Sequence, residues 1–297
     1  MSLSINNQIG DFNFHIKTNS MGSRTFQIRV PATSANIGPG FDVVGLSLSL
    51  YVNLSVSYPI DPPSTYLQPT LSYSGEGADE VPLDPYKNLT TRVALYVMRC
   101  HNILRFPSHL VLHVDNEIPF GRGLGSSGAA VIAGVLLGNE VGQLNLGSSR
   151  LLDFALMVER HPDNVTAALV GGFVGSYLKE LDKDASEAAS VPLSEVLPEY
   201  PHDADENWGL NPPVPPHGIG HYIRFPWSES IKAVAIIPTF ELSTAKARDV
   251  LPQQYSRKDL VRISFASYLR LGLILFAAGF QSTTIGRSNN CPRSNTT

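Results

Sequence analysis

The chain has 297 residues, of which 43% are hydrophobic and 16% charged, and its net charge is −4 at neutral pH. The hydrophobic share excludes a disordered chain, and the acidic balance excludes charge-driven binding to nucleic acid or to an anionic membrane. Two cysteines make no disulfide framework, and the longest apolar run, about 271–280, is too short for the ~20 residues of a membrane span. The composition therefore predicts a cytoplasmic enzyme, long enough for about two domains of ~100–200 residues.

Residues 1–20 show neither periodicity nor a secretory signal, and we interpret them as a disordered leader or as an upstream start that the fold does not need. Two strands are predicted after them. Phe26, Ile28 and Val30 alternate with polar residues, and a longer alternation runs from Leu46 to Tyr58. Such period-two spacing predicts a sheet that lays one face on a core.

Helices are predicted next along the chain. Asn88 can cap a helix whose apolar residues form one stripe as far as Cys100, and a strand is expected at 110–114. A helix of small residues is predicted at about 126–141, and a further helix begins near Ser148. This mixture of elements indicates an α+β protein.

The second half of the chain differs in composition. Residues 179–230 are acidic and rich in proline, which predicts a surface insertion with little fixed structure, and 233–237 is expected to be a buried strand. Residues 261–297 hold four arginines and no Asp, Glu or Lys, as a divergent tail would. The expected divisions are therefore a leader at 1–20, an ATP-binding domain at 21–178, an insertion at 179–230, the start of a second domain at 231–260 and a tail at 261–297.

The richest chemical signal is a glycine-rich loop between a strand and a helix, with the sequence Ile-Pro-Phe-Gly-Arg-Gly-Leu-Gly-Ser-Ser-Gly-Ala over 118–129. Its glycines let backbone approach a ligand, and the N–H groups of the following helix suit a phosphate. The formal dinucleotide pattern at 123–128 lacks an acidic residue about 20 positions on, and a P-loop lysine is absent. Neither of those two nucleotide-binding families fits.

The loop instead resembles the phosphate loop of the GHMP kinases. Three further segments resemble homoserine kinases within that superfamily, especially the fungal ones: Pro-Ala-Thr-Ser-Ala-Asn-Ile-Gly-Pro-Gly-Phe-Asp at 31–42, Glu-Arg-His-Pro-Asp-Asn at 159–164 followed by Gly-Gly-Phe at 171–173, and Ser-Thr-Ala-Lys-Ala-Arg at 243–248. The four motifs stand in the family's order. The resemblance implies a two-domain GHMP kinase fold, with an N-terminal domain like ribosomal protein S5 domain 2 and an incomplete ferredoxin-like C-terminal domain.

The same resemblance implies phosphoryl transfer from ATP to L-homoserine in threonine biosynthesis, with Mg²⁺, and leaves a homodimer open. It assigns Ser127 and Glu159 to the metal and Asn164 to the substrate hydroxyl. The remaining substrate contacts would come from Asn36 and Asp42 for the amino group, Arg248 for the carboxylate, and His161 and Thr244 for the pocket wall. The ATP contacts would come from Asn88, Pro119, Gly121, Gly123, Leu124, Gly125, Ser126, Ser127, Gly128 and Ala129.

No strong base for the substrate hydroxyl is evident. Asp163 is a candidate base, but it ranks below Asn164 as a substrate contact. After 261 the family pattern breaks, without the second carboxylate-binding arginine or the third glycine-rich motif. We therefore expect the chain to be unstable and far less active than full-length relatives. A catalytically dead nucleotide-binding protein is one alternative. Another superfamily kinase is a second, although mevalonate would offer no ammonium group to Asp42.

Overall fold

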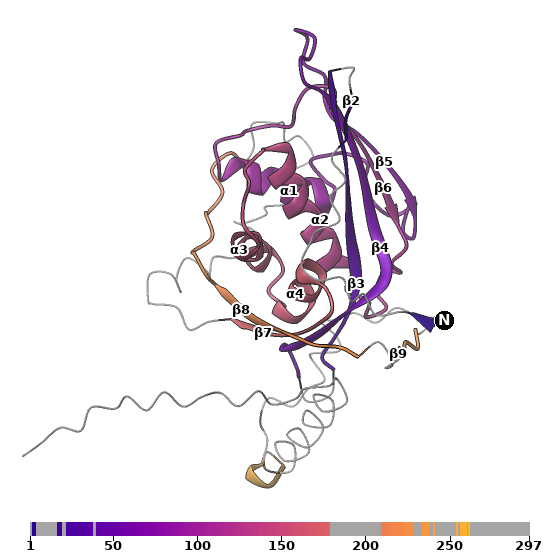
Figure 1. Ribbon diagram of the computed structural model, residues 1–297, viewed down its shortest axis with the longest axis vertical. Coiled ribbons are helices and arrows are strands. Elements are labelled where there is room, and N and C mark those ends of the chain that lie inside the picture. The colour runs from indigo at the N-terminus through magenta and orange to yellow at the C-terminus, as the bar shows by residue number, and fades with distance from the viewer. Residues whose placement is uncertain are drawn as a thin grey trace, which may run out of the picture.

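The computed structural model describes residues 2–3, 17–19, 22–37, 40–178, 209–228, 233–237, 240, 254, 256–259 and 261. Within them, four helices lie on one side of a curved sheet, and two further strands pass beneath the helices (Figure 1). The predicted α+β class is confirmed.

The sheet has the strand order β2-β3-β4-β6-β5, with β7 added at one end of β4 and β8 paired to β7. All pairs are antiparallel except β5 with β6, whose connection contains α1. The two short strands β1 and β9 pair with each other. The strands are β1 (Ser2–Leu3), β2 (Lys17–Asn19), β3 (Ser23–Ala35), β4 (Val44–Pro59), β5 (Thr70–Gly75), β6 (Val111–Asn116), β7 (Phe173–Leu178), β8 (Gly220–Phe225) and β9 (Ala233–Val234).

Strand β4 organises the sheet because three other strands pair with it. Its beginning, Val44–Leu46, pairs with β7, while 52–57 pairs with β6, and its other edge pairs with β3. The register between β3 and β4 shifts between Pro31 and Ala32, and such irregularities increase the local bend of a strand. The predicted alternation in both strands is confirmed: Phe26, Ile28 and Val30 are buried.

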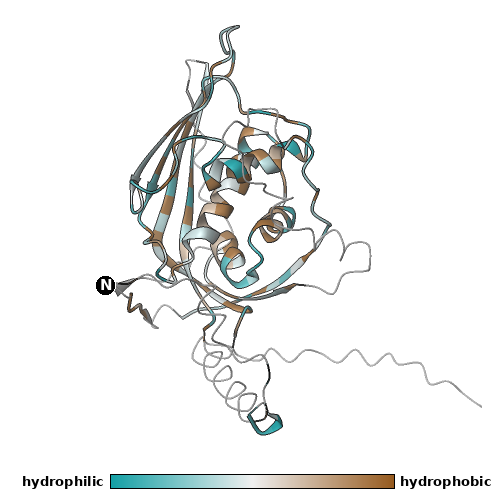
Figure 2. Ribbon diagram, turned by 180° about the vertical axis from the view of Figure 1, so that it is seen from behind, coloured by the Kyte–Doolittle hydropathy of each residue, from teal (hydrophilic) through white to brown (hydrophobic). Residues whose placement is uncertain are grey.

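The helices are α1 (Leu89–Arg99), α2 (Ser126–Val141), α3 (Ser148–Val158) and α4 (Pro162–Val170). Apolar residues of the helices face those of the sheet (Figure 2). Helix α2 is buried on nearly every side, and its glycines let α1 approach closely. A Cβ atom at Gly134 would meet the Thr90 carbonyl oxygen and come within 2.7 Å of Val93 Cβ. No helix in the described part of the chain is long and apolar enough to cross a lipid bilayer.

The prediction of little fixed structure for 179–230 is wrong at 220–225, which form β8. Buried polar side chains fix the segment that leads into this strand. The carboxylate of Asp153 accepts hydrogen bonds from the N–H groups of Gly218 and Ile219, at 3.0 and 2.9 Å, and Tyr96 donates to the Pro213 carbonyl at 2.9 Å. Residues 179–208 and 229–230 lie outside the described residues.

Two further expectations need correction. The leader interpretation of 1–20 is wrong for Ser2–Leu3 and Lys17–Asn19, which form β1 and β2. The predicted buried strand at 233–237 is a two-residue pairing with β1, and Val234 and Ile236 are 75% and 92% exposed. An apolar run alone cannot specify burial, because burial also requires a surface to pack against. Most of 241–297, including the predicted tail after Val261, lies outside the described residues.

The close approach of α1 and α2 predicts the effect of Gly134→Ala. Alanine favours a helix over glycine by about 1 kcal/mol, yet its methyl group has no room beside Thr90 and Val93. We expect a net loss of about 1–3 kcal/mol in the free energy of unfolding, measured by urea titration. Gly147→Ser is the control, because it adds a side chain into open space at the residue that caps α3. An increase in stability for Gly134→Ala would contradict the packing described.

Candidate active site

The glycine-rich loop connects β6 to α2 and ends at an exposed helix N-terminus. Gly121, Gly123 and Gly125 have φ angles of 64°, 72° and 64°, a left-handed conformation that glycine adopts without steric cost. Gly125 caps α2 without a side-chain hydrogen bond, and the first helical bond joins the Ala129 N–H to the Gly125 carbonyl at 2.9 Å. The preceding N–H groups of the helix therefore have no partner within it, which makes an anion site.

The end of β3 holds the glycine-rich loop in place. Leu124 is buried, and its carbonyl accepts a hydrogen bond from the Thr33 N–H at 3.0 Å. At the start of the loop, the Asn116 side chain bonds to both the N–H and the carbonyl of Ile118, each at 3.0 Å. The cradle is therefore formed by the fold before any ligand binds.

Two of the predicted metal ligands meet at the start of α2. The Ser127 hydroxyl donates to Glu159 Oε2 at 3.2 Å, and the other carboxylate oxygen of Glu159 contacts Nδ1 of His161. Glu159 immediately follows α3, and His161 immediately precedes α4. The short connection between these two helices thus holds one carboxylate beside the helix N-terminus.

Asn164 lies in the first turn of α4, directly beneath the glycine-rich loop. Thr33 donates its hydroxyl to Asn164 Oδ1 at 2.8 Å. A Cβ atom at Gly125 would meet the Thr33 hydroxyl and lie 3.0 Å from Asn164 Oδ1, and one at Gly128 would lie 3.4 Å from Asn164 Cβ. The glycines leave just enough room for α2 to begin above this pair.

The turn that follows β3 brings Asn36 and Asp42 together. The Asp42 N–H donates to Asn36 Oδ1 at 2.9 Å, and both residues have left-handed backbone angles, with φ of 57° and 55°. The Asn36 N–H is also close enough to the carboxyl group of Asp163, at the start of α4, to act on its pKa. The turn therefore lies beside the helix that carries Asn164.

Asp163 is fully buried, and one of its carboxyl oxygens, Oδ2, has no hydrogen-bond partner. Burial raises the pKa of this carboxyl above its usual range; the Asn164 N–H lowers it in part, and the negative charge of Asp42 raises it. The other oxygen of Asp163, Oδ1, accepts a hydrogen bond from the Asn164 N–H at 3.0 Å.

Two predicted site residues lie outside the described residues, namely Thr244 and Arg248. A third, Asn88, is the N-cap of α1: its side-chain oxygen accepts from the N–H groups of Thr90 and Thr91, at 3.0 and 3.5 Å. This confirms the predicted cap. The predicted ATP contact of Asn88 stays a prediction.

Two residues near the site were not predicted as part of it. Thr33 lies within the 31–42 motif, but its partners are residues distant in sequence. Arg122 is the one arginine or lysine between Arg105 and Arg150, and its Nε atom is buried without a hydrogen-bond partner. The sequence alone could have indicated Arg122 as a site residue, because it is a positively charged side chain between two glycines of the phosphate loop.

The described residues contain no group of three or more His, Cys, Asp or Glu side chains able to hold a metal ion. The donors present near α2 are one carboxylate and one hydroxyl, from Glu159 and Ser127. Oxygen donors in this number suit Mg²⁺, which takes its remaining ligands from substrate phosphates and water.

Comparison with known proteins shows which protein family this chain resembles. The model of the GHMP kinases N terminal domain matches residues 88–172. The homoserine kinase of Saccharomyces cerevisiae is 54% identical over 248 residues, which are 80% of this chain and 68% of the yeast protein. Those of Candida albicans and Schizosaccharomyces pombe are 49% and 47% identical, over 80% and 86% of this chain and 67% and 70% of their own lengths.

Solved structures agree in fold. A proposed homoserine kinase from Listeria monocytogenes superimposes with a TM-score of 0.53 at 27% identity, covering 84% of this chain and 68% of the other. The homoserine kinase from Cytophaga hutchinsonii gives a TM-score of 0.56 at 21% identity, covering 89% of this chain and 70% of the other.

The environment of Asp163 predicts a pH effect on stability. The folded chain holds this proton more tightly than the unfolded chain, because burial raises the folded pKa above the usual 3.8. The wild-type chain should therefore lose stability as the pH rises from about 3.8 through the folded pKa, by about 1.4 kcal/mol for each pH unit between the two pKa values.

Asp163→Asn should lack this loss, so its free energy of unfolding relative to wild type should increase with pH over that window. Urea titrations across the pH range measure the difference. Asp61→Asn, at an exposed carboxylate, controls for the change in net charge. Parallel pH profiles for wild type and Asp163→Asn would refute the assignment.

Proposed function

The chain belongs to the homoserine kinase family of the GHMP kinases, and from this premise we propose how its residues divide the transfer of a phosphoryl group from ATP to the side-chain hydroxyl of L-homoserine. The product is O-phospho-L-homoserine, in threonine biosynthesis. One observation carries the proposal. The glycine-rich loop, the Ser127–Glu159 pair and Asn164 come from separate segments, and they meet at the N-terminus of α2.

The triphosphate of ATP binds at the loop and at the first turn of α2. The free N–H groups of this turn and the positive end of the helix dipole both favour negative charge. The residues assigned to this cradle are Pro119, Gly121, Gly123, Leu124, Gly125, Ser126, Ser127, Gly128 and Ala129. Ala129 is fully buried and its N–H already bonds to the Gly125 carbonyl at 2.9 Å, so its place in the cradle stays a prediction from the sequence.

Ser127 and Glu159 would hold Mg²⁺ between them and the phosphates. Their oxygens lie 3.2 Å apart at the helix N-terminus, on the side where the phosphates bind. When bound, the ion neutralises charge on the β- and γ-phosphates. The contact between Glu159 and His161 holds the carboxylate in this orientation.

The acceptor site would combine Asn164 with the turn that carries Asn36 and Asp42. Asn36 and Asp42 would bind the amino group of L-homoserine, since their turn offers a carboxylate and an amide close together. Asn164 would bind the hydroxyl, and His161 would line the pocket. Thr244 and Arg248 complete the site as proposed from the sequence, with Arg248 on the substrate carboxylate.

The reaction forms a bond between the homoserine oxygen and the γ-phosphorus while the bond from that phosphorus to ADP breaks. ADP leaves with the electron pair, and the hydroxyl proton is released. Asp163 cannot take this proton, because its carboxyl is fully buried. Positioning and charge neutralisation therefore provide most of the acceleration, as loose phosphoryl-transfer transition states allow.

We further propose a cytoplasmic location, which the two cysteines in 297 residues support as typical of a reducing compartment. A homodimer stays a prediction.

The direct test is ADP release by the purified 297-residue chain with Mg²⁺ and ATP, in the presence and absence of L-homoserine. We expect release that depends on L-homoserine, with O-phospho-L-homoserine formed in equal amount. Saturable ATP binding by the folded chain without such release would favour the nucleotide-binding alternative instead.

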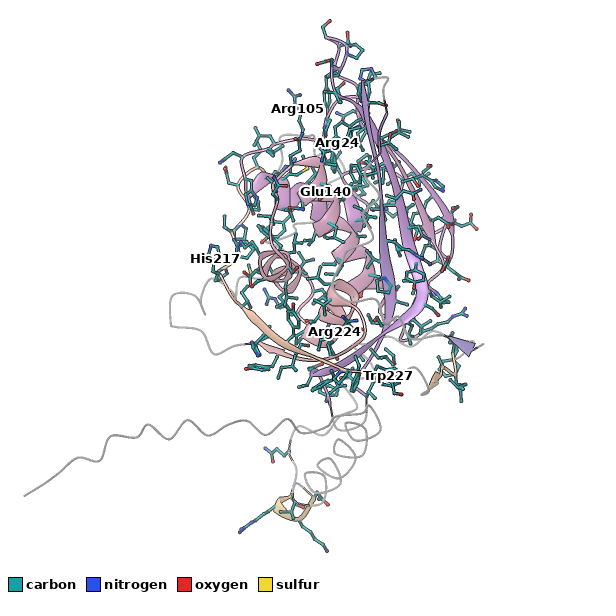
Figure 3. All side chains as sticks on the ribbon, in the orientation of Figure 1. Arg24, Arg105, Glu140, His217, Arg224 and Trp227 are labelled. Atoms are coloured by element: carbon teal, nitrogen blue, oxygen red, sulfur yellow. The ribbon has the colours of Figure 1, made fainter. Side chains whose placement is uncertain are left out.

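Glu159→Gln tests the metal assignment. The amide keeps the size of the side chain but removes its charge, so we expect about 10- to 100-fold less activity and a higher Mg²⁺ concentration for half-maximal rate. Glu140→Gln is the matched control. Glu140 is near the far end of α2, where it lies beside Arg24 (Figure 3). An unchanged Mg²⁺ requirement in Glu159→Gln would exclude Glu159 as a ligand.

A further inference from the structure

We infer that Thr33 is a positioning residue for phosphoryl transfer: its hydroxyl fixes the orientation of the Asn164 amide, so that the amide nitrogen donates a hydrogen bond to the substrate hydroxyl. This inference rests on the proposed function, because it specifies how the acceptor hydroxyl is held. Thr33 itself does not touch the substrate.

The position of Thr33 follows from the irregular pairing of β3 with β4. The register shifts between Pro31 and Ala32, after which Thr33 pairs opposite Ser47. Bulges of this kind re-aim side chains next to active sites. Thr33 is fully buried. Its strand, β3, lies against both α2 and α4 (Figure 1).

Thr33 makes two contacts there, and each reaches a different part of the site. Its N–H bonds to the Leu124 carbonyl at 3.0 Å, in the phosphate loop, and its hydroxyl donates to Asn164 Oδ1 at 2.8 Å, in the acceptor site. The same hydroxyl lies beneath Gly125, where any side chain would collide with it. Thr33 therefore sets the distance and the orientation between the two halves of the site.

The hydrogen bond decides which end of the Asn164 amide is presented to the substrate. Without a partner, an amide can turn over and offer either its oxygen or its NH₂ group. With Oδ1 held by the Thr33 hydroxyl, the NH₂ group is the end left for the ligand. It donates to a lone pair of the substrate oxygen, so the hydroxyl proton points away from Asn164 and another lone pair can approach the γ-phosphorus.

The test compares two ligands that differ only in the hydroxyl: L-homoserine and L-2-aminobutyrate. Their dissociation constants are measured by calorimetry on the full chain with Mg²⁺ and a non-hydrolysable ATP analogue. The variants are Thr33→Val, which keeps the shape but removes the hydroxyl, and Thr33→Ser, which keeps the hydroxyl and removes a methyl group.

We expect wild type to prefer L-homoserine, and Thr33→Val to lose about 3- to 10-fold of that preference while binding L-2-aminobutyrate as wild type does. Thr33→Ser should restore the preference even if it lowers stability. Thr33→Val should also have no further effect in an Asn164→Ala background. A role in stability alone would weaken the binding of both ligands together.

The outcomes separate this inference from the proposed function. If wild type distinguishes the two ligands and Thr33→Val retains the same preference, the inference about Thr33 fails and the proposed function stands. If wild type binds neither ligand, both fail. Equal loss of preference in Thr33→Val and Thr33→Ser would also overturn the inference, because the hydroxyl would then not be the group responsible.

Discussion

The structure depends on one close contact, between the N-terminus of α2 and the Thr33–Asn164 pair. Gly125 leaves no room for a side chain above the pair, and a Cβ atom at Gly128 would lie 3.4 Å from Asn164 Cβ. This contact places a helix N-terminus, which attracts phosphate, next to an amide that can hold an alcohol. Both requirements of phosphoryl transfer, charge stabilisation and orientation, are met by the same packing interaction.

The long strand β4 makes this contact possible. Because β7 and β6 pair with successive parts of one edge of β4, the sheet curves around the helices and returns beneath them (Figure 1). Gly45, near the start of β4, has a backbone so close to Asp163 that a Cβ atom would meet the Asp163 carbonyl and lie 3.1 Å from Ala167 Cβ. Helix α4 is therefore pressed between β4 on one side and α2 on the other.

Elements with a strong local pattern could be predicted from the sequence, whereas β5 and β8 could not. Strands β3 and β4 bury one face continuously, but in β5 Leu71 alone is fully buried and β8 has no fully buried residue. Those two strands are held by their pairing with β6 and β7, which no local pattern reveals. In the site, the sequence motifs indicated Ser127, Glu159 and Asn164. The role of Thr33 could not be predicted, because it depends on a hydrogen bond to Asn164, which is 131 positions away in the sequence.

That separation also affects how the protein folds. The Thr33–Asn164 hydrogen bond closes a loop of 131 residues, and contacts so distant in sequence are entropically costly and form slowly. During synthesis, β3 and the phosphate loop emerge well before α4, so the acceptor side cannot form until about residue 164 has left the ribosome. Nascent chains shorter than this can contain a glycine-rich loop, but the β3 end that supports it still lacks its partner in α4. The contact between the phosphate loop and the acceptor side is therefore a late event in folding.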